Sequence, residues 1–376
     1  MAKHEAIAAG QGGAQTTRRS PAEPDHSHEM PRIRLTRGRL VASLVFVVST
    51  VLFLYFVLPK LLGLQKTWNQ LQHGNPWWFG VAFVFTLLSF VAYVWLFRAV
   101  FVRGTTRIGW SESYQITMAG LAATRLFAAG GAGGIVLQVW ALRRAGLGSR
   151  TVACRTVAFL VLLYGVYMAA LVIDGMGLYL GVFPGSAPFA ITVVPAIFGA
   201  VVIALALAMA LVPGDLERLV ARWTTGGHLG GRIARRLAAF PATAATGVRT
   251  ALDFVRTGDA ALLGTIGWWA LNIAVLWACF HAFGKPPPLA VIVMAYFVGM
   301  LGNLLPLPGG IGGVDGGMIG ACTAFGVHVE LAVVAVLAYR AFSFWLPTLP
   351  GAIAYLQLRR TVHRWQAREA PSYSLT

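Results

Sequence analysis

A glycine-rich stretch, Leu301–Gly320, lies inside a long apolar region and limits how the chain can fold there. It reads LGNLLPLPGGIGGVDGGMIG, with two prolines, a dense run of glycines and one carboxylate, Asp315. Pro306 and Pro308 cannot donate backbone hydrogen bonds, and glycine permits backbone angles that other residues avoid. Irregular backbone at membrane depth is tolerated only where it is buried in protein or lines a water-filled cavity. The stretch therefore predicts a broken segment enclosed by protein. A surface loop or a tight helix-packing patch is the alternative.

The composition of the chain indicates a membrane protein. Hydrophobic residues make up 57% and charged residues 11% of the sequence, and the mean hydropathy is +0.69. A soluble core of this length would not be so poor in charge. The formal net charge is +17, but the basic residues fall in short runs between apolar segments. This pattern favours positive-inside orientation and contact with anionic lipid head groups, and it does not favour nucleic-acid binding.

A second glycine-rich segment, Gly120–Gly134, matches Gly299–Gly313 without a gap. The coinciding glycines, which we expect to act as gates, are Gly130, Gly131, Gly133 and Gly134 in the first copy and Gly309, Gly310, Gly312 and Gly313 in the second. Apolar segments flank both copies, so the sequence predicts an internal repeat with halves at about 77–180 and 260–358. Interrupted apolar segments at matching positions in two halves are typical of a transporter binding site.

The apolar runs predict an all-α polytopic membrane protein with about six transmembrane helices. The expected spans are Leu40–Leu62, Trp77–Phe101, Thr151–Leu180, Phe189–Val212, Ala260–Phe283 and Glu330–Leu358. A disordered tail, 1–35, precedes the transmembrane domain at 36–360, and a second tail, 361–376, follows it. Within the domain, 215–258 is rich in arginine and predicts short amphipathic helices on the cytoplasmic leaflet.

Basic flanks predict that both termini are cytoplasmic and that the two glycine segments are re-entrant hairpins. The first copy lies between basic residues and would enter from the cytoplasm, whereas near-neutral turns bound the second, which would enter from outside. The two halves then have opposite orientations, which is the inverted repeat of many transporters. A glycine segment that crossed the membrane completely would remove this inversion.

Four ionisable residues lie at or near membrane depth: Arg125, Asp174, Asp315 and Arg340. Charge is costly there, and such residues commonly mark a functional site. In the repeat register the positions opposite Arg125, Asp315 and Arg340 are Leu304, Val136 and Val161. The scaffold is therefore duplicated while the charges are not. Two cations and one anion could hold a phosphate-bearing head group, or Asp315 and Arg340 could be a structural pair. Asp174, near the outer end of its span, could reach interfacial water.

Two amides lie beside the glycine clusters, Gln138 and Asn303, and could line a cavity or form interhelical hydrogen bonds. The cysteines, Cys154, Cys279 and Cys322, are scattered in apolar segments, and the histidines form no metal-binding pair. No P-loop and no nucleophile–base constellation is visible. The sequence therefore predicts no metal site and no cofactor, and it favours a transporter over an enzyme.

Two motifs carry a resemblance to a known family: LFAAGGAGG with LRRAG, and LPLPGGIGGVDGG with AYRAFSFWLP. Together they resemble the flippase-like transmembrane domain of lysylphosphatidylglycerol synthases, over about Arg39–Arg360. The most specific matching positions are Pro308, Gly309, Gly310, Asp315, Tyr339 and Arg340. The acidic position is more usually Glu in that family. The first copy has Ala129 where proline is usual and lacks the acidic residue that normally follows.

The resemblance implies lipid translocation without lipid synthesis. We therefore expect a translocase of the bacterial cell membrane that moves a phospholipid or a polyprenyl-linked lipid between leaflets. Arg125 and Arg340 would engage the phosphate, and Asp315 would hold an amine or a proton. The alternatives are an ion-coupled small-solute transporter and a non-transporting membrane partner of a cell-envelope glycosyltransferase or synthase.

Overall fold

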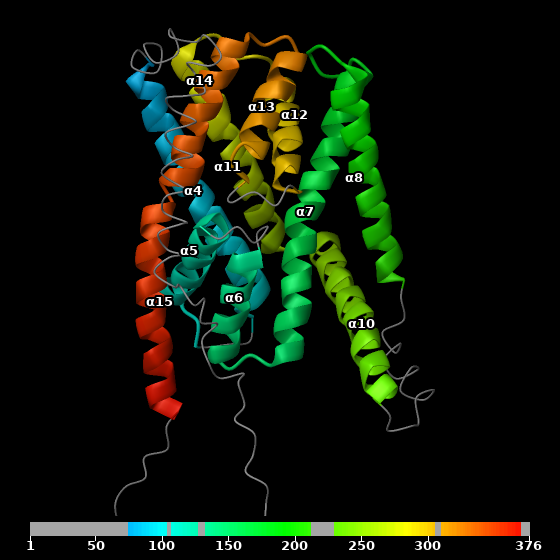
Figure 1. The fold of residues 1–376 in the computed structure, drawn as a ribbon, viewed down its shortest axis with the longest axis vertical. Coiled ribbons are helices and arrows are strands. Elements are labelled where there is room, and N and C mark those ends of the chain that lie inside the picture. Colours follow the sequence, from blue (N-terminus) through cyan, green and yellow to red (C-terminus); the bar gives the residue numbers. More distant parts are fainter. Residues whose placement is uncertain (1–73, 104–106, 127–131, 212–228, 305–309, 370–376) are drawn as a thin grey trace, which may run out of the picture.

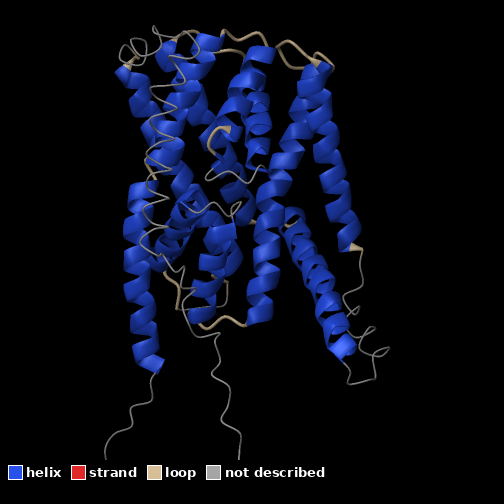
Figure 2. Ribbon diagram, viewed as in Figure 1, coloured by secondary structure: helices blue, strands red, loops and turns tan. Residues whose placement is uncertain are grey.

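A computed structural model of the protein describes residues 74–103, 107–126, 132–211, 229–304 and 310–369. All regular structure in these ranges is helical, with no strand (Figure 2). The α-helices are α4 (Pro76–Phe101), α5 (Trp110–Leu126), α6 (Ala132–Arg144), α7 (Ser149–Tyr179), α8 (Phe189–Ala210), α10 (Leu229–Arg256), α11 (Ala260–Phe283), α12 (Leu289–Met300), α13 (Gly313–Ala324), α14 (Val329–Arg340) and α15 (Thr348–Glu369). A 3₁₀ turn, Leu301–Leu304, extends α12, and a π-helical turn, Ala341–Trp345, joins α14 to the segment before α15.

Five helical segments in the described ranges are long and apolar enough to cross a membrane. They are α4, α7, α8, α11 and the combined segment Val329–Gln366. Two of them start at the caps that local chemistry favours. The Asn75 side chain accepts a hydrogen bond from the Trp77 amide at 3.0 Å ahead of α4, and Asp259 accepts one from the Ala261 amide at 2.9 Å ahead of α11. The expected span at 40–62 and the tail at 1–35 lie outside the described residues.

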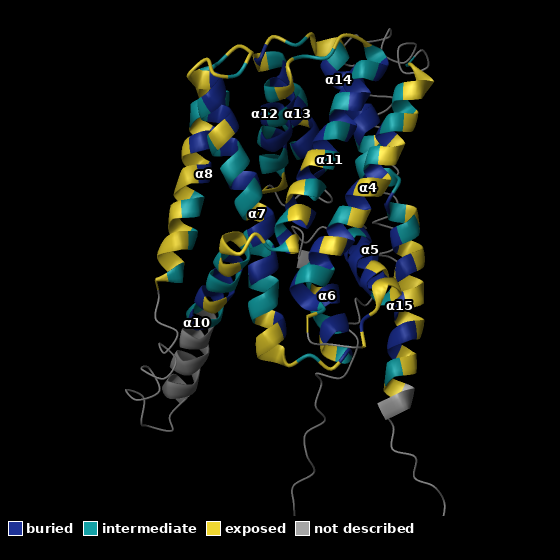
Figure 3. Ribbon diagram, turned by 180° about the vertical axis from the view of Figure 1, so that it is seen from behind, coloured by how far each residue is buried: buried dark blue, intermediate teal, exposed yellow. Residues whose placement is uncertain are grey.

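The outer faces of the bundle are apolar. Figure 3 shows exposed residues along the outward sides of α8 and α15. On α8, Leu205 is 65% exposed, and on α15, Leu349 is 73% exposed. Apolar side chains in such rows are expected on helices that face lipid, because hydrocarbon does not penalise their exposure.

Two pairs of half-length helices occupy opposite ends of the molecule. In Figure 1, α5 and α6 lie in the lower half, and α12 and α13 lie in the upper half. Each pair packs together, and α4 packs against α11 between them. The alignment that places Gly130 on Gly309 also places Trp110 on Leu289. These are the first residues of α5 and α12. The gap-free match of the two glycine segments therefore extends to the starts of their first helices.

Of the arginine-rich segment 215–258, the structure describes residues 229–258, and these contain one long helix, α10, where short surface helices were expected. Helix α10 continues through Pro241 and packs against α7 and α8. A Cβ on Gly247 of α10 would lie only 2.5 Å from Cβ of Val157 on α7. Small buried residues on the same face as Gly247, including Ala244 and Ala251, allow this close approach.

The last span is not the continuous helix, Glu330–Leu358, that the apolar run predicts. The α-helix ends at Arg340, a π-helical turn follows at Ala341–Trp345, and α15 begins only at Thr348. Pro347 lies at this break, where its missing amide hydrogen would interrupt a regular helix. Helix α15 also continues to Glu369, through residues 361–369 that were expected to belong to the tail. In this part the Thr361 hydroxyl donates to Oε1 of Gln115 on α5 at 2.9 Å.

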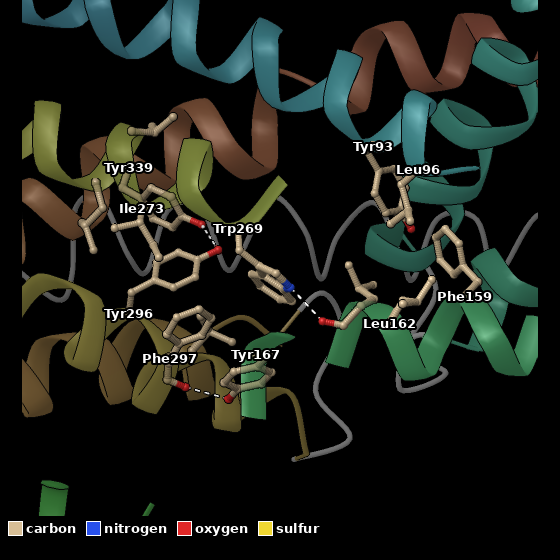
Figure 4. Close-up of a cluster of buried hydrophobic side chains, with 14 of the residues drawn as sticks. Tyr93, Leu96, Phe159, Leu162, Tyr167, Trp269, Ile273, Tyr296, Phe297 and Tyr339 are labelled. Atoms are coloured by element: carbon tan, nitrogen blue, oxygen red, sulfur yellow. Dashed lines mark hydrogen bonds between the residues drawn. The ribbon is translucent and has the colours of Figure 1, made fainter. Parts of the chain in front are cut away.

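An aromatic cluster fills the core between the two helix pairs (Figure 4). Trp269 of α11 donates its indole N–H to the carbonyl of Leu163 on α7 at 2.8 Å. The Tyr167 hydroxyl donates to the carbonyl of Phe297 on α12 at 2.6 Å, and their rings stack 4.9 Å apart. These bonds satisfy the polar ends of buried aromatic side chains. They tie α12 to the long helices α7 and α11.

Candidate functional site

A buried ion pair, Asp315 with Arg340, forms the centre of the candidate site. Asp315 lies in the first turn of α13, and Arg340 is the last residue of α14. Their side chains are 2% and 11% exposed. Nε of Arg340 bonds to Oδ1 of Asp315, and Nη2 lies 3.4 Å from Oδ2.

The local backbone explains why the carboxylate lies there. Gly310 and Gly312 have φ of +67° and +84°, a left-handed conformation that glycine adopts without a steric penalty. The Gly312 amide donates to Oδ2 of Asp315 at 2.9 Å, so the carboxylate caps α13 as well as pairing with Arg340. A negative charge in the first turn of a helix is also favoured by the helix dipole.

Arg125 comes to the same place from the other helix pair. It lies in the last turn of α5, and its Nη2 donates to the carbonyl of Ser343 in the π-helical turn at 2.7 Å. The ring of Phe344 is shared by the two arginines: Cζ of Arg125 lies 5.9 Å from the ring centroid, and Cζ of Arg340 lies 5.2 Å from it. Both guanidinium groups are therefore within cation–π range of one aromatic ring.

The cluster has more positive than negative charge. Arg125 and Arg340 contribute two guanidinium groups, and Asp315 is the carboxylate paired with one of them. Nη1 of Arg125 is buried and has no hydrogen-bond partner among the described residues. A buried donor without an acceptor is costly, and more so when it belongs to a charged group. The site can thus accept an anion that supplies oxygen atoms to Arg125.

The two amide side chains, Gln138 and Asn303, lie beside the points where the half-length helices cross. Neither is hydrogen-bonded to Arg125, Asp315 or Arg340 in the bonds that the described residues show. Gln138 is buried on α6, and a Cβ on Gly120 would lie 2.9 Å from its Nε2. Asn303 is exposed, and a Cβ on Gly310 would lie 2.4 Å from its Oδ1. Both side chains therefore fill space next to backbone that only glycine leaves open.

Close backbone approach occurs at the gate glycine Gly134 and at Gly302, which precedes the second glycine cluster, whereas a Cβ on the gate glycine Gly312 would meet nothing within 4 Å. A Cβ on Gly134 would lie 2.4 Å from the carbonyl oxygen of Gly120, where α6 crosses α5. A Cβ on Gly302 would lie 2.4 Å from the carbonyl oxygen of Gly313, at the crossing of the second pair. The glycine-rich segments therefore both interrupt the helices and allow close packing between them, so the two interpretations of these segments are compatible. Gly130, Gly131 and Gly309 lie outside the described residues.

Sequence reasoning missed Ser343 and Phe344 as parts of the site. An aromatic residue in an apolar span is most often a packing residue, yet the ring of Phe344 lies within cation–π range of both arginines. The signal available in the sequence was the AFSFWLP stretch after Arg340, where aromatic residues are followed by a proline. Pro347, four residues after Ser343, has no N–H to bond the Ser343 carbonyl, so this carbonyl is left for a side chain.

The fold and the site define a polytopic helical membrane protein whose half-length helices bring three charged side chains together in its interior. The chain belongs to the lysylphosphatidylglycerol synthase transmembrane region family, whose profile matches residues 40–351. The predicted resemblance is thereby confirmed.

Curated relatives include proteins of Methanothermobacter thermautotrophicus that are described only as UPF0104 membrane proteins. One is 37% identical over 91 residues, which cover 24% of this chain and 26% of the relative. Another is 34% identical over 106 residues, which cover 28% of this chain and 31% of the relative. The chain thus spans between a quarter and a third of the length of these relatives.

Proposed function

We propose that this protein is a lipid translocase that moves a phosphate-bearing phospholipid or polyprenyl-linked lipid between membrane leaflets. The observation that carries the proposal is the buried Nη1 atom of Arg125, which has no hydrogen-bond partner among the described residues. Phosphate oxygens are strong acceptors for guanidinium groups. The family takes its name from the synthase of a phospholipid, which favours a lipid over a free anion.

In this proposal α5–α6 and α12–α13 are re-entrant hairpins of an inverted repeat, with Arg125 from the last turn of α5 and Asp315 from the first turn of α13 in the charge cluster. Arg125 and Arg340 engage the phosphate, and Asp315 holds an amine of the head group or a proton. Small motions at the glycine crossings expose the cluster to one side of the membrane and then to the other. The basic flanks favour cytoplasmic termini, with the first hairpin opening toward the cytoplasm.

Two other functions remain as alternatives. An ion-coupled small-solute transporter could use the same cluster for a soluble anion. A non-transporting partner of a cell-envelope glycosyltransferase or synthase would use the charges only to fix its own fold.

Arg125→Gln is expected to lower inter-leaflet transfer at least about tenfold, because it removes charge-assisted hydrogen bonds to the phosphate. The measurement uses proteoliposomes with head-group-labelled phospholipid, and a membrane-impermeant quencher reports the exposed leaflet. Arg340→Ala and Asp315→Asn are tested in parallel.

The matched control is Arg103→Gln, which removes a cation that is 49% exposed and pairs with Asp259 away from the cluster. It should retain the wild-type rate. Wild type that moves neither phospholipid nor polyprenyl phosphate would contradict the proposal and favour the non-transporting partner.

A further inference from the structure

A second charged group is buried outside the cluster, at Asp174 of α7. Its relative exposure is 8%, and its Oδ2 has no hydrogen-bond partner among the described residues. The expectation that this side chain reaches interfacial water is therefore wrong. Helix α7 packs against α8 and α12, and both helices approach it closely at Gly175, the residue next to Asp174.

The packing beside Asp174 leaves little space for a counterion. A Cβ on the adjacent Gly175 would lie 2.5 Å from the carbonyl oxygen of Thr192 on α8 and 3.2 Å from Cε of Met294 on α12. The Thr192 hydroxyl already donates to the carbonyl of Pro188 at 2.8 Å. Helix α8 carries no charged or titratable side chain in Phe189–Ala210, and α12 carries Tyr296, whose hydroxyl lies 3.4 Å from that of Tyr339. Further charged or titratable residues lie beyond these helices at the outer end of the bundle: Lys285, His328 and Glu330.

A pocket of about 330 Å³ lies at that outer end, and the loop that follows α7 forms part of its wall. Its wall includes Gly185, Val291 and the polar residues Ser186, Lys285 and His328. A Cβ on Gly185 would lie 3.0 Å from Cδ2 of Leu178. Because Leu178 and Asp174 are four residues apart on α7, they share a face, and about one helical turn separates the carboxyl group from the pocket wall.

An ionised carboxylate without a partner is too costly in such surroundings, and the group binds a proton instead. We propose that Asp174 is a proton-binding site supplied from the outer pocket. Loss of the proton would leave a charge among α7, α8 and α12 and would favour their separation, which admits water and shifts α12. Proton binding at Asp174 could then drive lipid transfer with the energy of a proton gradient. This coupling of proton movement to lipid transfer rests on the proposed lipid transport.

The proton site itself is tested without any transport assay. The hydrophobic reagent dicyclohexylcarbodiimide adds to protonated carboxyl groups in apolar surroundings, and peptide mass spectrometry locates the adduct. In the full chain in detergent, we expect label on Asp174 at neutral pH that falls several-fold at strongly alkaline pH. Asp315, which is equally buried but paired with Arg340, is the internal control and should stay unlabelled.

An infrared measurement covers the case in which the reagent cannot enter. The carbonyl band of a protonated carboxyl group should be present in wild type at neutral pH and absent from Asp174→Asn. Glu330→Gln, which changes an exposed carboxylate, should keep the band. No difference in this band between wild type and Asp174→Asn would overturn the proton site.

The coupling is tested in proteoliposomes with an imposed pH gradient. Wild-type transfer should change several-fold with the gradient, and Asp174→Asn should lose this response while Glu330→Gln retains it. If the labelling and infrared tests find the proton site but lipid transfer does not depend on the pH gradient, the coupling is overturned and the proposed translocase function is not. Absence of all transfer would count against the proposed function instead.

Discussion

Replacing Asp315 with Ala is expected to lower the free energy of unfolding by about 3–5 kcal/mol, because the change leaves a buried arginine without its carboxylate. Arg340 is only 11% exposed and cannot turn to bulk water without disturbing α14. The same substitution removes the acceptor for the Gly312 amide, which donates to Asp315 at 2.9 Å. Unfolding in detergent, followed by tryptophan fluorescence, measures the loss.

A double variant separates the structural role of the pair from its proposed role in transport. Asp315→Leu combined with Arg340→Met removes both charges and keeps similar volume, so it should recover most of the stability lost in the single variant. Lipid transfer should remain lost, because the phosphate then has only Arg125. A double variant that transfers lipid at the wild-type rate would show that the pair is structural.

Gly302→Ala should destabilise the second pair of half-length helices by about 1–3 kcal/mol, because the added methyl group meets backbone that cannot give way. A Cβ at this position would lie 2.3 Å from the carbonyl carbon of Gly313 and 2.6 Å from the Val314 amide nitrogen. We expect lipid transfer to fall with stability, since the crossing lies next to Asp315. The same unfolding and transfer assays apply.

The control for this substitution is Gly316→Ala, on α13 of the same helix pair. Nothing lies within 4 Å of a Cβ there, so the change should be neutral or stabilising by up to about 1 kcal/mol through helix propensity. In the first pair, Gly134→Ala should behave like Gly302→Ala, because its Cβ would lie 2.1 Å from Oγ1 of Thr124. Equal effects of Gly302→Ala and Gly316→Ala would show that the crossing does not constrain the backbone.

The long membrane helices could be predicted because their signals are local. Apolar runs of span length end at polar or basic turns, and caps such as Asn75 and Asp259 mark where helices begin. The glycine register also gave equivalent starts for α5 and α12, since a duplicated sequence keeps its own breaks. The interruption after Arg340 escaped prediction because the residues of Ala341–Trp345 are compatible with a regular helix.

The candidate site was predictable only in part, because its parts come from segments distant in the chain. Charge in an apolar region indicated Arg125, Asp315 and Arg340 one by one. Their convergence depends on how two helix pairs pack, as the bond from Arg125 to the carbonyl of Ser343 shows. The burial of Asp174 likewise depends on α8 and α12, which no pattern within α7 reveals.

The break in the last membrane segment has a mechanical consequence. Helix α14 packs against α11 and α13, whereas α15 packs against α5 and α6. The two parts of one segment therefore belong to different bodies, joined by a hinge at Ala341–Trp345. Phe344, which contacts both arginines, lies on this hinge. A change in the angle between α14 and α15 would alter the separation of Arg125 and Arg340, so bending at this hinge would reshape the proposed anion site, and an anion held by both arginines would resist the bending.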